Sequence, residues 1–206
     1  MEDIVEIDYI NGIKIKLDKR SARFHEWCGS FNKNGEFATE EVMQIYDQLK
    51  DIENPVMIDI GANTGSHSML GLVISNLICY SFEPVPLFYE ILKNNLKLNN
   101  LCDKVFVSNF ALSDKIGFIN LSIQNGTSHV DPNGELQVAC ITLDSIHFDK
   151  VDYIKIDTDG HDQFVLEGAR ETLKKFRPKV LYEGQDDGGT CSRIIQEIYK
   201  EKEVMI

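Results

Sequence analysis

Short apolar runs alternate with longer amphipathic stretches through most of the chain. The runs have the length and composition of buried strands and cover residues 56–60, 77–82, 104–109, 151–156 and 179–183. Apolar residues at helical spacing predict helices over 39–53, 84–98, 163–176 and 190–200, and residues 66–72 can start another. Strands that alternate with helices are typical of an α/β protein, so we expect a mostly parallel, doubly wound sheet.

Two segments depart from this alternation. Residues 4–10 and 13–17 flank Asn11-Gly12, a dipeptide typical of tight hairpin turns, which predicts an N-terminal β-hairpin. Residues 118–123 and 136–142 have the pattern of strands on either side of a polar loop. Because a crossover built from strands is unusual in a doubly wound sheet, we expect an insertion there.

Two loops are candidates for the wall of a pocket. Residues 18–38 are irregular and aromatic, with Trp27 among them, and they either cover a pocket or pack over the sheet edge. The polar loop 124–134 could reach the ligand-binding face of the sheet.

Composition and charge narrow the class of protein. With 43% hydrophobic and 26% charged residues, we expect one globular domain over residues 1–206. Residues 1–38 would form an accessory hairpin and loop, and residues 39–206 the ligand-binding core. A net charge of −12 without a basic run argues against nucleic acid or an anionic membrane surface as the main partner. Five scattered cysteines, no visible leader and no apolar run near about 20 residues favour a cytoplasmic protein with free thiols.

The turn after the first central strand carries the clearest ligand signal. Three residues separate Gly61 from Gly65, a spacing that matches neither the G-x-G-x-x-G dinucleotide fingerprint nor a phosphate loop. Asp59, just before the turn, would repel a pyrophosphate but suits a cationic ligand. Glu83 ends the next strand, where an acid accepts hydrogen bonds from ribose hydroxyls. These residues favour S-adenosylmethionine, which has an amino group, a sulfonium and no phosphate; the alternative is an ordinary strand-turn-helix with a structural aspartate.

The ends of two later strands add further candidates. Phe110 and Ala111 follow the third strand, where they either flank an adenine or belong to the core. Ionisable side chains cluster after the fourth strand, at Asp157, Asp159, His161 and Asp162. Lys155 lies within that strand, where its charge needs a partner or water.

Together these stretches resemble the FkbM family of S-adenosylmethionine-dependent methyltransferases. The matching segments follow in family order at 58–65, 82–84, 111–114, 154–162 and 178–183, and the Lys-Ile-Asp-x-Asp-Gly-His-Asp run is the most family-specific. The resemblance implies a Rossmann-like class I methyltransferase fold with a seven-stranded sheet and helices on both sides. It also implies methylation of hydroxyls on sugars, polyketides and other small molecules.

The chain departs from the family pattern in two ways. Asp159 and Asp162 stand where the family usually has glutamate, which pulls each carboxylate back by a methylene. The chain ends soon after the fifth strand and its helix, so we expect a shortened C-terminus. The exposed sheet edge would then be covered by the hairpin or by a partner chain, unless the sequence is a fragment.

The resemblance also suggests residue roles. Gly61, Asn63 and Gly65 would shape the pocket for the methionine end of the cofactor, with Asp59 near its cationic portion. Glu83 would bind the ribose, and Phe110 and Ala111 would frame the adenine.

The catalytic candidates are His161, Asp157 and Asp159. His161 is the expected general base because imidazole titrates near neutral pH, although it could instead be a helix-terminal residue bonded to a nearby acid. Asp157 would face the methyl donor and the acceptor. A divalent cation held by Asp157, Asp159, His161 and Glu183 is a less favoured alternative, and we expect no metal.

Two functions from different classes remain open. The first is an O-methyltransferase for a small-molecule hydroxyl, with a sugar or glycan as the expected acceptor and a homo-oligomer as one arrangement. The second is a catalytically inactive cofactor-binding or assembly subunit of the same fold.

Overall fold

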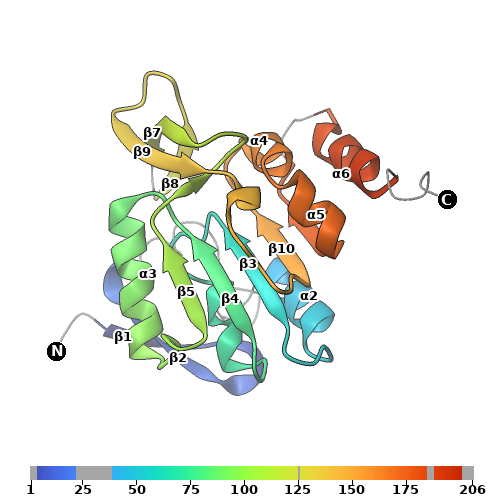
Figure 1. Ribbon diagram of the computed structural model, residues 1–206. Coiled ribbons are helices and arrows are strands. Elements are labelled where there is room, and N and C mark those ends of the chain that lie inside the picture. The colour runs from blue at the N-terminus through green and yellow to red at the C-terminus, as the bar shows by residue number, and fades with distance from the viewer. Residues whose placement is uncertain (1–3, 22–38, 125, 185–187, 201–206) are drawn as a thin grey trace.

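The centre of the protein is a five-stranded parallel sheet. The computed structural model describes residues 4–21, 39–124, 126–184 and 188–200 (Figure 1). The strand order is β11-β10-β3-β4-β5, with bounds β3 (Val56–Ile60), β4 (Ile78–Phe82), β5 (Val105–Ser108), β10 (Tyr153–Ile156) and β11 (Lys179–Tyr182). All five predicted strands and the parallel sheet are thus confirmed. The seven strands that the resemblance implied are not present among the described residues, whose central sheet has five.

Helices cover both faces of this sheet, as a doubly wound fold requires. One face packs against α2 (Glu40–Leu49) and α3 (Pro86–Leu98) through a core that includes Met57 and Cys79. The other face packs against α4 (Asp162–Glu167), α5 (Arg170–Phe176) and α6 (Thr190–Lys200) through Ile58 and Ile154. Neighbouring residues of one strand point to opposite faces, so each strand contributes to both cores. No helix in the described part of the chain is long and apolar enough to cross a membrane.

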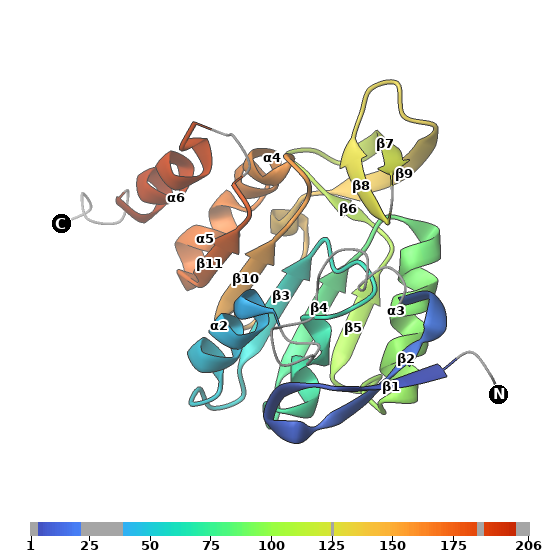
Figure 2. The same ribbon diagram turned by 180° about the vertical axis from the view of Figure 1, so that it is seen from behind.

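The N-terminal hairpin is confirmed and lies on α3. It consists of β1 (Ile4–Asp8) and β2 (Lys14–Asp18), joined by the short η1 (Ile10–Gly12), in which Asn11 has φ +58°. Asn95 Oδ1 accepts a 2.7 Å hydrogen bond from the backbone N–H of Asp18, and Asn99 bonds both the N–H and the C=O of Lys16. Two asparagines one helical turn apart therefore attach the hairpin to α3 (Figure 2). Residues 22–38 of the predicted aromatic cover lie outside the described residues.

The helix N-cap predicted at Thr39 is confirmed, whereas the helix predicted over 66–72 is not an α-helix. The Thr39 hydroxyl accepts the N–H of Val42 at 3.3 Å. The second segment forms only the 3-10 helix η2 (Ser68–Leu72). The Ser68 hydroxyl donates to the carboxylate of Asp59 at 2.8 Å, which holds the first turn against the strand.

The helix predicted over 163–176 is interrupted between α4 and α5. Gly168 lies at the break, and a Cβ there would be 1.9 Å from the carbonyl oxygen of Ser113. The carboxylate of Asp144, in η3 (Leu143–Ser145), accepts the N–H groups of Glu171 and Thr172 at 2.9 and 2.8 Å. This carboxylate caps α5, so contacts from distant parts of the chain begin a new helix where periodicity alone predicts a continuous one.

The predicted insertion forms a second sheet above the carboxyl ends of the central strands (Figure 1). Its order is β6-β9-β7-β8, with β6 (Ala111–Leu112), β7 (Gly117–Gln124), β8 (Thr127–Val130) and β9 (Leu136–Ile141). The polar loop predicted over 124–134 contains β8, which pairs antiparallel with β7. This small sheet covers part of the carboxyl ends of the central strands (Figure 1).

Gly168→Ala should lower the free energy of unfolding by about 1–3 kcal/mol, because the added methyl group meets backbone that must move. Gly117→Ala is the matched control, since a Cβ at Gly117 has no atom within 4 Å. Urea unfolding of both variants measures the difference. Equal stability of the two would show that the contact with Ser113 does not require glycine.

Candidate functional site

The site lies where the strand order changes direction. From β3 the chain continues to β4 and β5 on one side, whereas β10 and β11 lie on the other. The register pairs Lys155 with Asp59 and Ile156 with Ile60, so the loops after β3 and β10 leave the sheet side by side. Open α/β sheets bind ligands at such a switch point.

Gly61 allows these two loops to touch. Its φ is +73°, and a Cβ would lie 1.8 Å from the carbonyl oxygen of Asp157. Its N–H bonds the carbonyl of Phe82 at 3.0 Å, which ties the turn to β4 as well. A side chain at this position would separate the two strand ends, so glycine is required by packing and by backbone conformation together.

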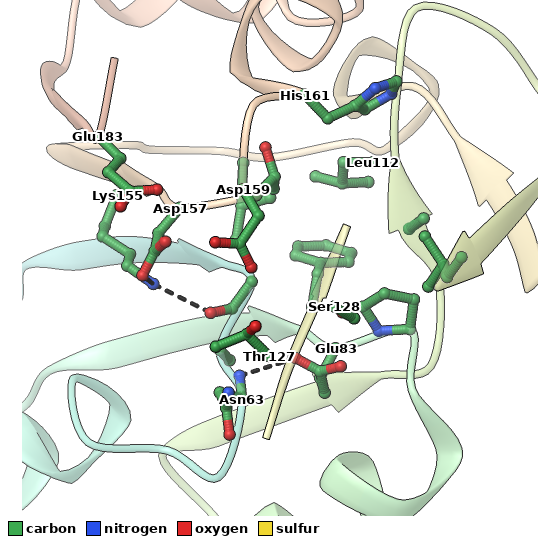
Figure 3. Close-up of a pocket in the computed structure, with 18 of the residues that line it drawn as sticks. Asn63, Glu83, Leu112, Thr127, Ser128, Lys155, Asp157, Asp159, His161 and Glu183 are labelled. Carbon is green, nitrogen blue, oxygen red and sulfur yellow. Dashed lines mark hydrogen bonds and ion pairs between the residues drawn. The ribbon is translucent and has the colours of Figure 1, made fainter. Parts of the chain in front are cut away.

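A cavity of about 360 Å³ opens above these loops, within the roughly 300–1,000 Å³ typical of small-molecule sites (Figure 3). Its lining includes Gly61, Asn63, Glu83, Phe110, Ala111, Asp157, Asp159 and His161, all of them predicted site residues. Thr127 and Ser128 also line it, which confirms that the polar loop reaches this face. The other two predicted residues, Asp59 and Gly65, are not part of the lining.

Lys155 connects the loops that form the base of the cavity. Its Nζ lies 3.0 Å from the carbonyl oxygen of Gly61, 3.1 Å from Asp157 Oδ2 and 3.5 Å from Asp59 Oδ1. Burial alone would lower the pKa of Lys155, but the carboxylates of Asp157 and Asp59 outweigh it and raise that pKa. Asp59 is fully buried and reaches the cavity only through this ammonium group. Asp59 and Asp157 are therefore the partners that the buried charge of Lys155 was expected to need.

Glu83 connects the glycine turn to the start of α3. Its Oε2 accepts the N–H of Asn63 at 2.7 Å, and its Oε1 accepts the N–H of Val85 at 2.8 Å. Burial raises the pKa of Glu83 to about 7, against the two backbone hydrogen bonds, which lower it. Each carboxylate oxygen keeps one further lone pair for a ligand hydroxyl.

The glycine turn presents one buried acceptor without a partner. Asn63 has φ +50°, and its Nδ2 donates to the carbonyl of Gly126 at 3.1 Å. Among the described residues, nothing donates to its Oδ1, which is buried. Gly65, with φ +100°, fits under α3, where a Cβ would lie 2.4 Å from a methyl group of Leu92. Gly65 thus shapes the turn, and Asn63 Oδ1 is open to a ligand donor.

The cavity has an apolar end and an acidic end. Phe110, which is 40% exposed, lines the apolar end with Ala111, Leu112, Leu121 and Val130. At the acidic end, one carboxylate oxygen from each of Asp157, Asp159 and Glu183 lies within 4.8 Å of the others. In Figure 3, Leu112 lies on the opposite side of the close-up from Asp157 and Glu183.

The acids of this end differ in their proton affinity. Burial opposes ionisation of Asp157, but the charge of Lys155 outweighs it and lowers the pKa of Asp157. Burial and then the charge of Asp157 raise the pKa of Asp159. The three carboxylates are suitable ligands for a divalent cation. His161, the fourth ligand considered from the sequence, is not among them.

His161 lies at the Leu112 side of the cavity, away from Lys155 and Glu183 (Figure 3). Its Nε2 is 3.0 Å from the hydroxyl of Ser113, and its ring stacks on Phe164 at 4.7 Å. Burial lowers the pKa of His161, so that the neutral imidazole is favoured. The structure thus brings His161 to the cavity without bringing it to the two aspartates.

Comparison with known proteins identifies the family to which this chain belongs. The sequence profile of the methyltransferase FkbM domain matches residues 59–203, more than half of the chain. The chain belongs to the FkbM methyltransferase family. The matched region contains the glycine turn, Glu83 and the acidic end of the cavity.

Individual relatives of this FkbM-family chain are distant. The hexuronic acid methyltransferase AglP of Haloferax volcanii is 27% identical over 130 residues, which cover 59% of this chain and 53% of that protein. The chain therefore spans about half the length of this curated relative.

Two solved structures support the fold. Methyltransferase FkbM from Methylobacillus flagellatus KT gives a TM-score of 0.55 at 19% identity, over 70% of this chain and 37% of that chain. Precorrin-6y C5,15-methyltransferase from Geobacter metallireducens GS-15 gives 0.51 at 17% identity, over 82% and 74%.

Among the ionisable residues that line the cavity of the FkbM-family chain, two were not recognised from the sequence as candidates, Glu41 and His67. In the sequence, Glu41 was interpreted as an acid that favours the start of a helix. His67 was interpreted as part of the helix predicted over 66–72. Asp162 was noticed, but its carboxylate bonds the N–H groups of Thr158, Glu183 and Gly184 at 3.1, 3.2 and 3.2 Å. Asp162 therefore connects the loops that follow β10 and β11 and has a structural role.

Lys155→Met should lower the free energy of unfolding by about 3–5 kcal/mol, because Asp59 would be left buried without its cation. The double variant Asp59→Asn/Lys155→Met should recover about 1–3 kcal/mol of that loss. Urea unfolding of the two single variants and the double variant forms the required cycle. Additive effects would mean that the two side chains are not coupled.

Proposed function

We propose that this FkbM-family protein is an S-adenosylmethionine-dependent O-methyltransferase that acts on a hydroxyl of a small molecule, with a sugar or glycan as the acceptor. The observation that carries the proposal is the single cavity in which the glycine turn, Glu83 and the acidic end of β10 meet. Similarity to AglP, a hexuronic acid methyltransferase, supports a sugar as acceptor.

The residues around the glycine turn fit this cofactor. Asn63 Oδ1 is a buried acceptor to which no described residue donates, which suits a ligand that brings N–H or O–H donors. Asp157, at the acidic end, disfavours a pyrophosphate. Glu83 would hold the ribose, Phe110 and Ala111 the adenine, and Gly61 and Asn63 the methionine end, with Asp59 acting through Lys155.

The cofactor would supply an activated methyl group, so the chain mainly has to orient the acceptor and remove its proton. Asp159 is the better-tuned base, because its raised pKa makes it more basic than Asp157. Asp157, fixed by Lys155, would orient the acceptor hydroxyl. This assignment differs from the sequence-based expectation for His161, whose Nε2 faces Ser113.

Calorimetric titration should show binding of S-adenosylhomocysteine and no binding of NAD or ATP. Glu83→Ala should weaken that binding roughly 5- to 150-fold, as hydrogen bonds to a buried charged group are lost. Glu90→Ala, an exposed acid on α3, is the control and should bind normally. A well-folded chain that binds none of the three ligands would contradict the proposal and favour an assembly subunit.

Asp159→Asn should slow methyl transfer roughly 10²–10⁴-fold and leave the affinity for S-adenosylhomocysteine unchanged, because only proton removal is impaired. His161→Ala should change the rate much less. Single-turnover transfer of a labelled methyl group to an accepted sugar measures both rates. The opposite order, with His161→Ala the slower variant, would return the base role to His161.

A further inference from the structure

A second carboxylate faces the acidic end of the cavity from another part of the fold. Glu41, in the first turn of α2, lines the cavity and keeps 53% of its side chain exposed. Its Oε2 lies 3.7 Å from Nε2 of His67, which is buried and lines the same wall. His67 Nδ1 is 3.3 Å from the hydroxyl of Ser66. The imidazole therefore lies next to the Glu41 carboxylate at the wall of the cavity.

The position of Glu41 separates it from the predicted nucleoside end. Electrostatic interactions join Glu41 to Asp157 and Lys155, which belong to the acidic end. Glu83, the proposed ribose contact, lies beside Asn63 and apart from Lys155 and Asp157 in Figure 3. Glu41 thus belongs to the acidic end, which the proposed function assigns to the acceptor.

The side chains at the acidic end of the cavity carry mainly negative charge. The carboxylates of Glu41, Asp157, Asp159 and Glu183 line it, and Lys155 is the lysine in the described lining. The Lys155 ammonium is already shared by Asp59, Asp157 and the Gly61 carbonyl. Among the described lining residues, an incoming carboxylate would therefore meet like charge and no free cation, whereas hydroxyl groups would find charged acceptors.

We propose that Glu41, which lies next to His67, binds the methyl acceptor, and that this acceptor is an uncharged polyhydroxyl compound rather than a uronic acid. The proposal rests on the proposed function, because it concerns the acceptor end of the same cavity. It departs from the acceptor class in the name of the relative AglP.

Calorimetry with S-adenosylhomocysteine tests the location of Glu41 without any knowledge of the acceptor. Glu41→Gln should keep the dissociation constant within about twofold of the unmodified chain. Glu40→Gln is the matched control, because it removes the neighbouring acid from the same helical turn and is not part of the cavity lining. If Glu41→Gln weakens binding as much as Glu83→Ala does, Glu41 belongs to the cofactor and the proposal is overturned.

Labelled methyl transfer to paired acceptors tests the substrate class. The pairs are methyl glycosides of neutral hexoses and of the corresponding hexuronic acids. The neutral member should have at least a tenfold higher kcat/KM. Glu41→Gln should reduce that value by roughly 10- to 100-fold, chiefly through KM, and narrow the discrimination against the uronic acid. Glu40→Gln should match the unmodified chain.

Faster transfer to the uronic acids, or transfer to none of the neutral acceptors, would overturn the proposal while binding of S-adenosylhomocysteine still supported the proposed function. Absence of that binding in the unmodified chain would instead contradict the proposed function itself. The two failures are therefore distinguishable.

Discussion

The ammonium group of Lys155 is the interaction on which the rest of the site depends. It lies buried between Asp59 and Asp157 and donates to the carbonyl of Gly61, so one side chain fixes the ends of β3 and β10. A buried ion pair gains little net stability, since desolvation offsets the attraction, but the loss of one partner is costly. The cluster therefore acts less as a source of stability than as a constraint on where the two loops can lie.

Other acids extend this constraint around the cavity. Glu83 binds the backbone of the glycine turn and of the start of α3, and Asp162 binds the loops after β10 and β11. In each case the carboxylate accepts backbone N–H groups from segments distant in sequence. Loops fixed in this way present a preformed cavity, which reduces the ordering cost of ligand binding.

The sequence predicted the strands, the glycine turn and eight of the residues that line the cavity, because these depend on local pattern. It placed Asp59 against the ligand, whereas the structure buries Asp59 behind Lys155. The difference arises from strand alternation, since Asp59 points to the same face as Met57, toward the core under α2 and α3. The break at Gly168 and the positions of Glu41 and His67 depend on contacts between distant segments, which periodicity does not reveal.

The acidic end of the cavity also suits the chemistry of the proposed methyl transfer. Methylation of a neutral hydroxyl ends with a proton leaving the acceptor oxygen, and a nearby carboxylate stabilises the positive charge that builds there. A carboxylate paired with a buried lysine is a weak base, whereas one raised in pKa by burial is a stronger one. Asp157 and Asp159 lie two residues apart and have these contrasting environments. In the proposed mechanism the two neighbouring aspartates would therefore have different roles, one to orient the acceptor and one to accept its proton, because only one of them contacts Lys155.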